Sequence, residues 1–163
     1  MYSKEEMKKH LQEDPEAFAK ILQEAISDSW RSAWLLNHCI EKNDVRLQNH
    51  IESIADSIEG KEDGHRRELM KILLKMEFDN ELEGKIFNLA VNTWEQIRQQ
   101  PSVRQVAFRL IVKIAKKHPD LAHEIHLLTK PHYLEPLSKG IKHSVLTMIA
   151  EMDSLSKNTG KST

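Results

Sequence analysis

Residues 101–117 read PSVRQVAFRLIVKIAKK, and this stretch decides the fold. From Ala107 onward its apolar side chains fall at relative positions 0, 1, 3, 4 and 7. On a helix of 3.6 residues per turn these positions form one broad apolar stripe. Proline is well suited to the first turn of a helix, so the segment predicts an amphipathic helix that begins at Pro101.

The same spacing occurs three more times in the chain. Copies begin at Leu69 and Val145, and an earlier copy begins at Ala33, where only Asn37 departs from the apolar rule. The steps between successive copies are 36, 38 and 38 residues. A constant step of this length is typical of proteins built from helical repeats. An ordinary helical bundle whose periodicity arises by chance is the alternative interpretation.

A leading helix is predicted before each copy, which makes the repeating unit a helical hairpin. In the second hairpin this helix is marked by Leu47, Ile51 and Ile54 and ends near Gly60. Neither helix of a hairpin can bury its apolar stripe alone, so neighbouring hairpins must stack on one another. Strand-like alternation of apolar and polar residues is not evident, and we therefore expect an all-α fold.

The predicted starts of the first two helices depend on capping residues. Ser3 and Glu6 form a capping-box pattern for a polar helix that ends near Glu13. Asp14 and Pro15 then provide a cap and a first-turn proline for the next helix. The first of these helices carries few apolar residues, as is typical of a terminal cap on a repeat protein.

These features resemble the HEAT-like, armadillo-type helical repeat family. The resemblance is carried by Val103-Arg104 with Ala107 in the third copy, by Trp30-Arg31 in the first, and by turns marked with Asp and Pro, and it covers roughly residues 15–155. It implies a right-handed α-solenoid of about four HEAT-like hairpins with an N-terminal capping helix. It also implies that the second helix of each hairpin lines a concave face, where such proteins hold a partner.

The chain is expected to form one domain over residues 1–155, followed by a disordered tail over residues 156–163. The single cysteine, Cys39, cannot form a disulfide within the chain, and the charged N-terminal segment does not resemble a signal peptide. No apolar run approaches the roughly 20 residues that a bilayer requires. We therefore expect a cytoplasmic protein with no membrane association.

Charge is divided unevenly along the chain. Residues 1–65 contain 8 Lys/Arg and 14 Asp/Glu, whereas residues 66–163 contain 16 and 11. We call the helix that carries each copy of the spacing a motif helix. Counted from the first residue of the copy, positions −2, 2 and 6 of each motif helix lie opposite the predicted core. In the two middle copies these positions are rich in cations. With the cations near the helix starts they define a basic stripe, our candidate partner-binding site: Arg31, Arg66, Arg67, Lys71, Lys75, Arg104, Arg109, Lys113 and Lys142. Leu35, Cys39 and Gln105 are also expected on this outward face.

The basic stripe favours an acidic peptide, a phosphate-bearing ligand or a nucleic-acid backbone as its ligand. A solvated face that happens to be rich in Lys and Arg is the structural alternative. We interpret the chain as a non-enzymatic scaffold for a protein or peptide partner. The alternative is a nucleic-acid-binding module or a DNA-repair enzyme resembling the HEAT-like alkylpurine glycosylases.

The sequence predicts no cofactor and no catalytic residues. Four histidines lie between His118 and His132, and His123 and His126 share a helix face. Their spacing lacks a standard zinc-ligand motif, so we assign no metal. Cys39 has no catalytic signature around it and is interpreted as a small helix-face residue.

Overall fold

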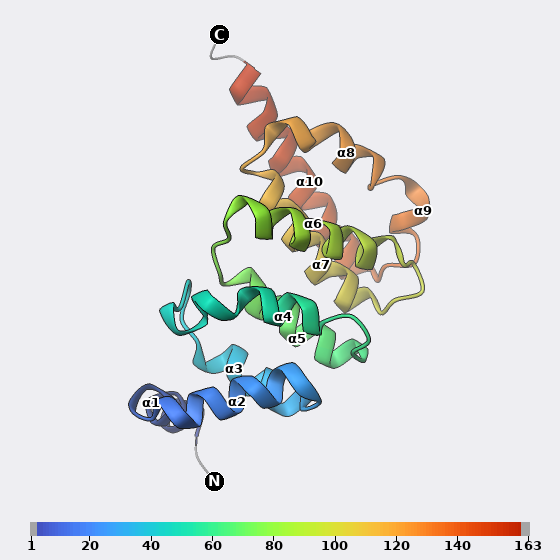
Figure 1. Cartoon of the computed structure of the whole chain (residues 1–163). Helices are drawn as coiled ribbons and strands as arrows, with labels where there is room; N and C mark the ends of the chain where they lie inside the picture. The colour runs from blue at the N-terminus through green and yellow to red at the C-terminus, as the bar shows by residue number, and fades with distance from the viewer. Residues whose placement is uncertain (1–2, 161–163) are drawn as a thin grey trace. The chain divides into compact units, whose positions relative to one another are not determined.

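The computed structural model describes residues 3–160, with side chains as far as residue 155. All regular elements in this range are helices, and the range contains no strand (Figure 1). The prediction of an all-α fold is therefore confirmed for the described part of the chain. The chain divides into two compact units, of which the first ends at Leu82 and the second begins at Glu83. Within residues 3–160, no helix is both long enough and apolar enough to cross a bilayer.

Helices α1 (Lys4–Glu13) and α2 (Pro15–Ser27) begin where the capping residues predict. The Ser3 hydroxyl accepts a hydrogen bond from the Glu6 amide at 3.1 Å, and the Glu6 carboxylate accepts one from the Ser3 amide at 3.1 Å. Asp14 Oδ1 accepts hydrogen bonds from the first amides of α2. Both caps satisfy helix amides that would otherwise lack a partner.

The first unit contains two helical hairpins. Helix α3 (Trp30–Cys39) packs against α2, and α5 (Asp63–Leu74) packs against α4 (Ile51–Ser57), which continues a 3₁₀ turn, η1 (Val45–His50). Between the hairpins, α2 contacts α4 and α3 contacts α5. Leading helix therefore lies on leading helix and motif helix on motif helix, as stacking of equivalent hairpins requires.

The core of the first unit is the apolar stripe of α5. Leu69, Met70, Ile72, Leu73 and Met76 are all fully buried, as the spacing predicts. Each such side chain contributes roughly 1.5–3 kcal/mol by leaving water. The hairpin turn before α5 contains a glycine with a positive φ of 85° at position 60. A β-carbon at that position would meet no atom within 4 Å, so the glycine is required by the backbone rather than by lack of space.

The second unit is organised around α7 (Pro101–Ala115), which begins at the predicted proline. All five residues of its stripe are buried, and α7 packs against α10. The Trp94 indole packs 4.7 Å from the Phe108 ring and donates a hydrogen bond to the Leu128 carbonyl at 2.7 Å. The remaining described elements are α6 (Asn80–Glu95), η2 (Pro119–Leu121), α8 (Ala122–Leu127), α9 (Pro131–Leu134) and α10 (Lys139–Gly160).

The fourth copy departs from the prediction. Val145 is buried, but Leu146 is 47% exposed, so the apolar stripe of α10 is only partly covered. Pro131 starts the short helix α9, because proline fits the first turn of a helix. The backbone of α10 is helical as far as Gly160, which lies within the segment expected to be disordered. Residues 161–163 of that segment lie outside the described part of the chain.

Candidate functional site

Helix α5 supplies four members of the basic stripe. Arg66, Arg67, Lys71 and Lys75 are all half-buried, whereas the opposite side of the helix is fully buried in the core. The last three are spaced four residues apart, which places them along one face of the helix. The side chains of Arg67 and Lys71 are 28% and 39% exposed, and their aliphatic stems cover part of the helix surface.

A buried carboxylate lies beneath these cations. Glu68 Oε1 is 3.7 Å from Lys71 Nζ and 3.9 Å from Arg67 Nε. Its Oε2 accepts a hydrogen bond from Asn37 Nδ2 at 3.0 Å. Glu68 therefore partly neutralises two cations of the stripe. Sequence reasoning missed this residue because it considered only positions −2, 2 and 6 of each motif helix.

The contacts of Asn37 account for the polar residue in the apolar spacing of the first copy. Its side chain is buried in α3 and bonds to Glu68 of α5, so a polar group replaces an apolar contact between the two motif helices. A buried amide is tolerated at such a place because its hydrogen bond offsets the cost of desolvation. The polar exception in the first copy is thus the partner of the buried carboxylate in the second copy.

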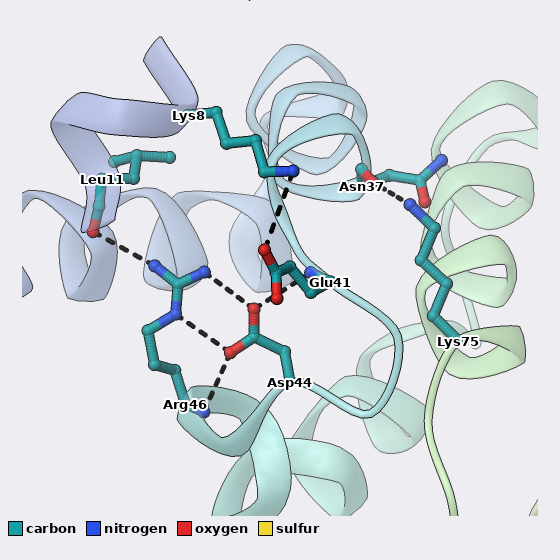
Figure 2. Close-up of polar contacts among 7 residues, drawn as sticks. All are labelled: Lys8, Leu11, Asn37, Glu41, Asp44, Arg46 and Lys75. Carbon is teal, nitrogen blue, oxygen red and sulfur yellow. Dashed lines mark hydrogen bonds and ion pairs between the residues drawn. The ribbon is translucent and has the colours of Figure 1, made fainter. Parts of the chain in front are cut away.

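Lys75 is held against the end of α3. Its ammonium group donates a hydrogen bond to the Asn37 carbonyl, one of the last carbonyls of that helix (Figure 2). A cation at a helix C-terminus is stabilised by the helix dipole. Burial lowers the pKa of Lys75, and the nearby charges of Lys8 and Lys71 lower it further. Three cations thus crowd this part of the first unit, and Lys8 was not predicted because it belongs to the polar capping helix.

The neighbouring polar contacts are structural (Figure 2). Arg46 donates from Nε and Nη2 to the two carboxylate oxygens of Asp44 at 3.0 and 2.7 Å, and from Nη1 to the Leu11 carbonyl at 3.1 Å. These hydrogen bonds from Arg46, with backbone amides, lower the pKa of Asp44 to about 2. Lys8 lies 3.9 Å from Glu41. Together these contacts attach the segment after α3 to α1.

Cys39 does not lie on the outward face as expected. It is fully buried, and burial raises the pKa of its thiol despite the nearby charges of Lys8, Arg46 and Lys75. The prediction was wrong because α3 is covered on this side by α1, which contacts it. Arg31, near the start of the same helix, is exposed and forms no ion pair within the described residues.

Arg104 was predicted to lie in the basic stripe, and this prediction was wrong. Its side chain is fully buried, with Nε donating to the Trp94 carbonyl at 2.9 Å and Nη2 to the Tyr133 carbonyl at 2.7 Å. Burial lowers the pKa of this guanidinium. Arg104 therefore joins the ends of α6 and α9 to α7 and is not available to a partner.

The other members of the stripe in the second unit remain nearer the surface. Arg109 is exposed on α7, and Lys113 and Lys142 are half-buried. Gln105, which was expected on the same outward face, donates from Nε2 to Ser144 Oγ at 3.1 Å. Helix α10 therefore covers part of the outward face of α7 near its start. Arg109, further along α7, remains exposed.

Two of the four histidines in the second unit's cluster, His118 and His126, each contact a carboxylate. His118 Nε2 lies 2.6 Å from Glu83 Oε2, and His126 Nε2 lies 3.2 Å from Asp153 Oδ1. The hydrogen bond from His118 is the largest cause of the lowered pKa of Glu83, which is buried. Among the side chains described, no group of three or more His, Cys, Asp or Glu residues could hold a metal ion.

Comparison with known proteins identifies the family. No curated protein and no solved structure matches the chain. A family model described as HEAT repeat domain matches residues 3–152, across both units. That match agrees with the stacked hairpins of the first unit and with the buried stripes of α5 and α7. Because it covers nearly the whole sequence, the chain belongs to the HEAT repeat domain family.

Proposed function

We propose that this protein is a non-enzymatic scaffold that binds an acidic segment of a partner protein through the outward faces of the motif helices α3 and α5 of its first unit. HEAT repeat domains typically serve as scaffolds for protein interactions. The proposal adds the chemistry of the partner and the surface that it uses. Its central element is α5, with Arg31 as an exposed cation on α3, the motif helix of the preceding hairpin in the same unit.

The crowding of cations at α5 carries the proposal. Arg67 and Lys71 both lie near one carboxylate, Glu68, while the neighbouring Lys75 donates to the Asn37 carbonyl, and the charge of Lys8 lowers the pKa of Lys75. An excess of partly buried positive charge is costly, because charges lose hydration when they are buried. A carboxylate from a partner would offset that cost, which makes the site selective for anions.

The partner is a protein rather than a nucleic acid in this proposal. Over residues 1–65 the chain carries more acidic than basic residues, and a duplex would be repelled by that part of the surface. Proteins that bind single-stranded nucleic acid stack the bases on aromatic side chains. The corresponding positions 67, 71 and 75 at α5 hold Arg, Lys and Lys, so none of the three offers an aromatic ring for stacking. Nucleic-acid binding is therefore an outcome to be tested and not the leading function.

The test is charge reversal followed by binding of a labelled acidic peptide, measured by fluorescence anisotropy at two salt concentrations. The variants are Lys71→Glu, Arg31→Glu and the pair together, both in the first unit. Each removes one positive and adds one negative charge at a residue directed away from the core. We expect the pair to weaken binding at least tenfold, with the difference reduced at high salt because exposed charges are screened.

Lys20→Glu provides a matched control, because Lys20 is exposed on α2 and outside the basic stripe. It should leave the affinity for the acidic peptide nearly unchanged. If the double variant folds normally and binds the peptide as the wild type does, the basic stripe is only a solvated surface. If random duplex DNA binds more tightly than the peptide and is lost in the same variants, the nucleic-acid function replaces this proposal.

A further inference from the structure

The first unit contains a pocket that the basic stripe does not use. It has a volume of about 610 Å³ and lies between the α2–α3 turn and the α4–α5 turn. Its lining residues are Ser27, Asp28, Trp30, Gly60, Lys61, Glu62, Gly64 and His65. A volume of this size falls within the range of ordinary ligand-binding pockets.

Trp30 forms an aromatic wall of this pocket. It is the first residue of α3, and 46% of its surface is exposed, which is high for the largest side chain in proteins. Gly64 in the first turn of α5 lies against the indole. A β-carbon at position 64 would be 3.1 Å from Trp30 Nε1, so glycine permits this close approach. The ring is thus supported by the α5 backbone while part of it remains open.

The other two tryptophans already carry a cation. Lys4 Nζ lies 5.2 Å from the centroid of the Trp34 ring, and the guanidinium of Arg104 lies 4.3 Å from that of Trp94. Within the described residues no Lys or Arg takes the equivalent position over Trp30. Tryptophan offers the strongest cation–π contact of the aromatic residues. Its exposed ring is therefore available for a cation from another molecule.

The charges around the pocket favour a cationic ligand. Asp28 and Glu62 are exposed, and neither carboxylate forms an ion pair or a hydrogen bond within the described part of the chain. Lys61 is the cation in the pocket lining, and its single charge offsets only one of these two carboxylates. A negative rim beside an aromatic wall is the arrangement that recognises ammonium and guanidinium groups.

The wall of the pocket is fixed before any ligand binds. His65 is buried, and its Nε2 lies 2.6 Å from the Ala25 carbonyl, so this nitrogen carries the ring proton. This hydrogen bond joins the first turn of α5 to the last turns of α2, which bear the two sides of the pocket. A preformed pocket binds more tightly because less motion is lost on association.

We infer that this pocket binds a lysine or arginine side chain of a partner protein, with the cation over Trp30 and its charge paired with Asp28 and Glu62. The inference is independent of the proposed function, because it uses other residues and a ligand of opposite charge. A partner that carries an acidic and a basic segment would engage both surfaces.

A pair of synthetic peptides tests the inference. One contains a single lysine in a Gly/Ser sequence, and the other contains acetyl-lysine at the same position. Binding to the wild type is measured by the change in tryptophan fluorescence, and binding to Trp30→Ala, which lacks the reporting ring, is measured by peptide anisotropy. The lysine peptide should bind and the acetylated peptide should not. Trp30→Ala should weaken binding about two- to thirtyfold, the range that cation–π contacts produce.

Charge variants give a second measurement that does not depend on the tryptophan. Asp28→Asn with Glu62→Gln should weaken binding of the lysine peptide, and Lys61→Gln should strengthen it, in a peptide-anisotropy assay. Glu13→Gln with Glu16→Gln is the matched control, because these carboxylates are exposed and outside the pocket. The control should leave the affinity unchanged.

Three results would overturn the inference: equal binding of the two peptides, unchanged affinity in the Asp28/Glu62 variant, or preference for an acidic peptide that Lys61→Gln abolishes. If Trp30→Ala does not fold, the exposed carboxylate pair still decides the question. Lys71→Glu should not weaken the lysine peptide, so failure of this inference and failure of the proposed function are distinguishable.

Discussion

The guanidinium group of Arg104 lies 4.3 Å from the centroid of the Trp94 ring and donates a hydrogen bond to the backbone carbonyl of the same residue. Both side chains are fully buried in the second unit. Arg104 therefore contacts both the ring and the backbone of Trp94. A second hydrogen bond to the Tyr133 carbonyl extends this attachment to α9.

We predict that Arg104→Lys destabilises the protein by about 1.5–3 kcal/mol. An ammonium group lacks the planar fork that reaches two carbonyls in different directions, so one of them loses its partner. Urea unfolding measures the change in free energy. Arg98→Lys is the control, because Arg98 is exposed, and it should change stability by less than about 0.5 kcal/mol. Equal stability of the two variants would show that Arg104 has no structural role.

Leu110→Ala should cost on the order of 2–5 kcal/mol, because Leu110 is fully buried at the centre of α7 and truncation leaves a cavity. Thermal or urea unfolding gives the value. The adjacent exposed residue provides a comparison, since Arg109→Ala should cost less than about 0.5 kcal/mol. If the two variants are equally stable, the assignment of the α7 core face is incorrect.

Local signals in the sequence predicted much of the fold. The capping box at Ser3, the cap at Asp14 and the proline at 101 act within a few residues, and the helices begin at those places. Apolar spacing likewise identified the buried stripes of α5 and α7. These features are determined by residues that are close together in the sequence, so they can be predicted from a single sequence.

The polar residues were predicted less well, because their positions depend on distant partners. Arg104 is charged, which is typical of a surface residue, but it is buried and donates hydrogen bonds to the carbonyls of Trp94 and Tyr133. Asn37 and Glu68 are 31 positions apart and explain each other only once α3 and α5 are packed together. A helical period cannot show which neighbouring helix offers a partner for a buried polar group.

Asp44 should make stability depend on pH in acid solution. Its pKa is about 2 in the folded protein, below the ordinary value of 3.8, chiefly because Arg46 donates to its carboxylate. A lowered pKa stabilises the fold fully above about pH 4, and this contribution is lost as the pH falls toward 2. The contribution is on the order of 2 kcal/mol.

Asp44→Asn should remove this dependence, which is measured as the difference in unfolding free energy between wild type and variant from pH 2 to pH 6. The difference should grow up to about pH 4 and then remain constant. Arg46→Gln removes the hydrogen-bond donor instead, and it should reduce the pH dependence of the unfolding free energy over the same pH range. An unchanged difference across the range would mean that the carboxylate is not held in this pair.

Glu68→Gln tests whether the buried carboxylate competes with a partner for the basic stripe. The amide retains the shape of the side chain and can still accept a hydrogen bond from Asn37, but it no longer neutralises Arg67 and Lys71. We expect the affinity for an acidic peptide to rise about two- to fivefold, the range of partly exposed ion pairs. Anisotropy titration measures it, and a fall in affinity in a folded variant would argue against an anion site on α5.

The positive φ of Gly60 has a consequence for handedness. An L-residue is strained at a φ of 85°, but the mirror-image D-residues favour that region. A chemically synthesised chain with D-alanine at position 60 would keep the hairpin turn and restrict the unfolded chain at the same point. The turn between α4 and α5 is thus a position where reversed chirality should stabilise the protein, by about 0.4–1 kcal/mol.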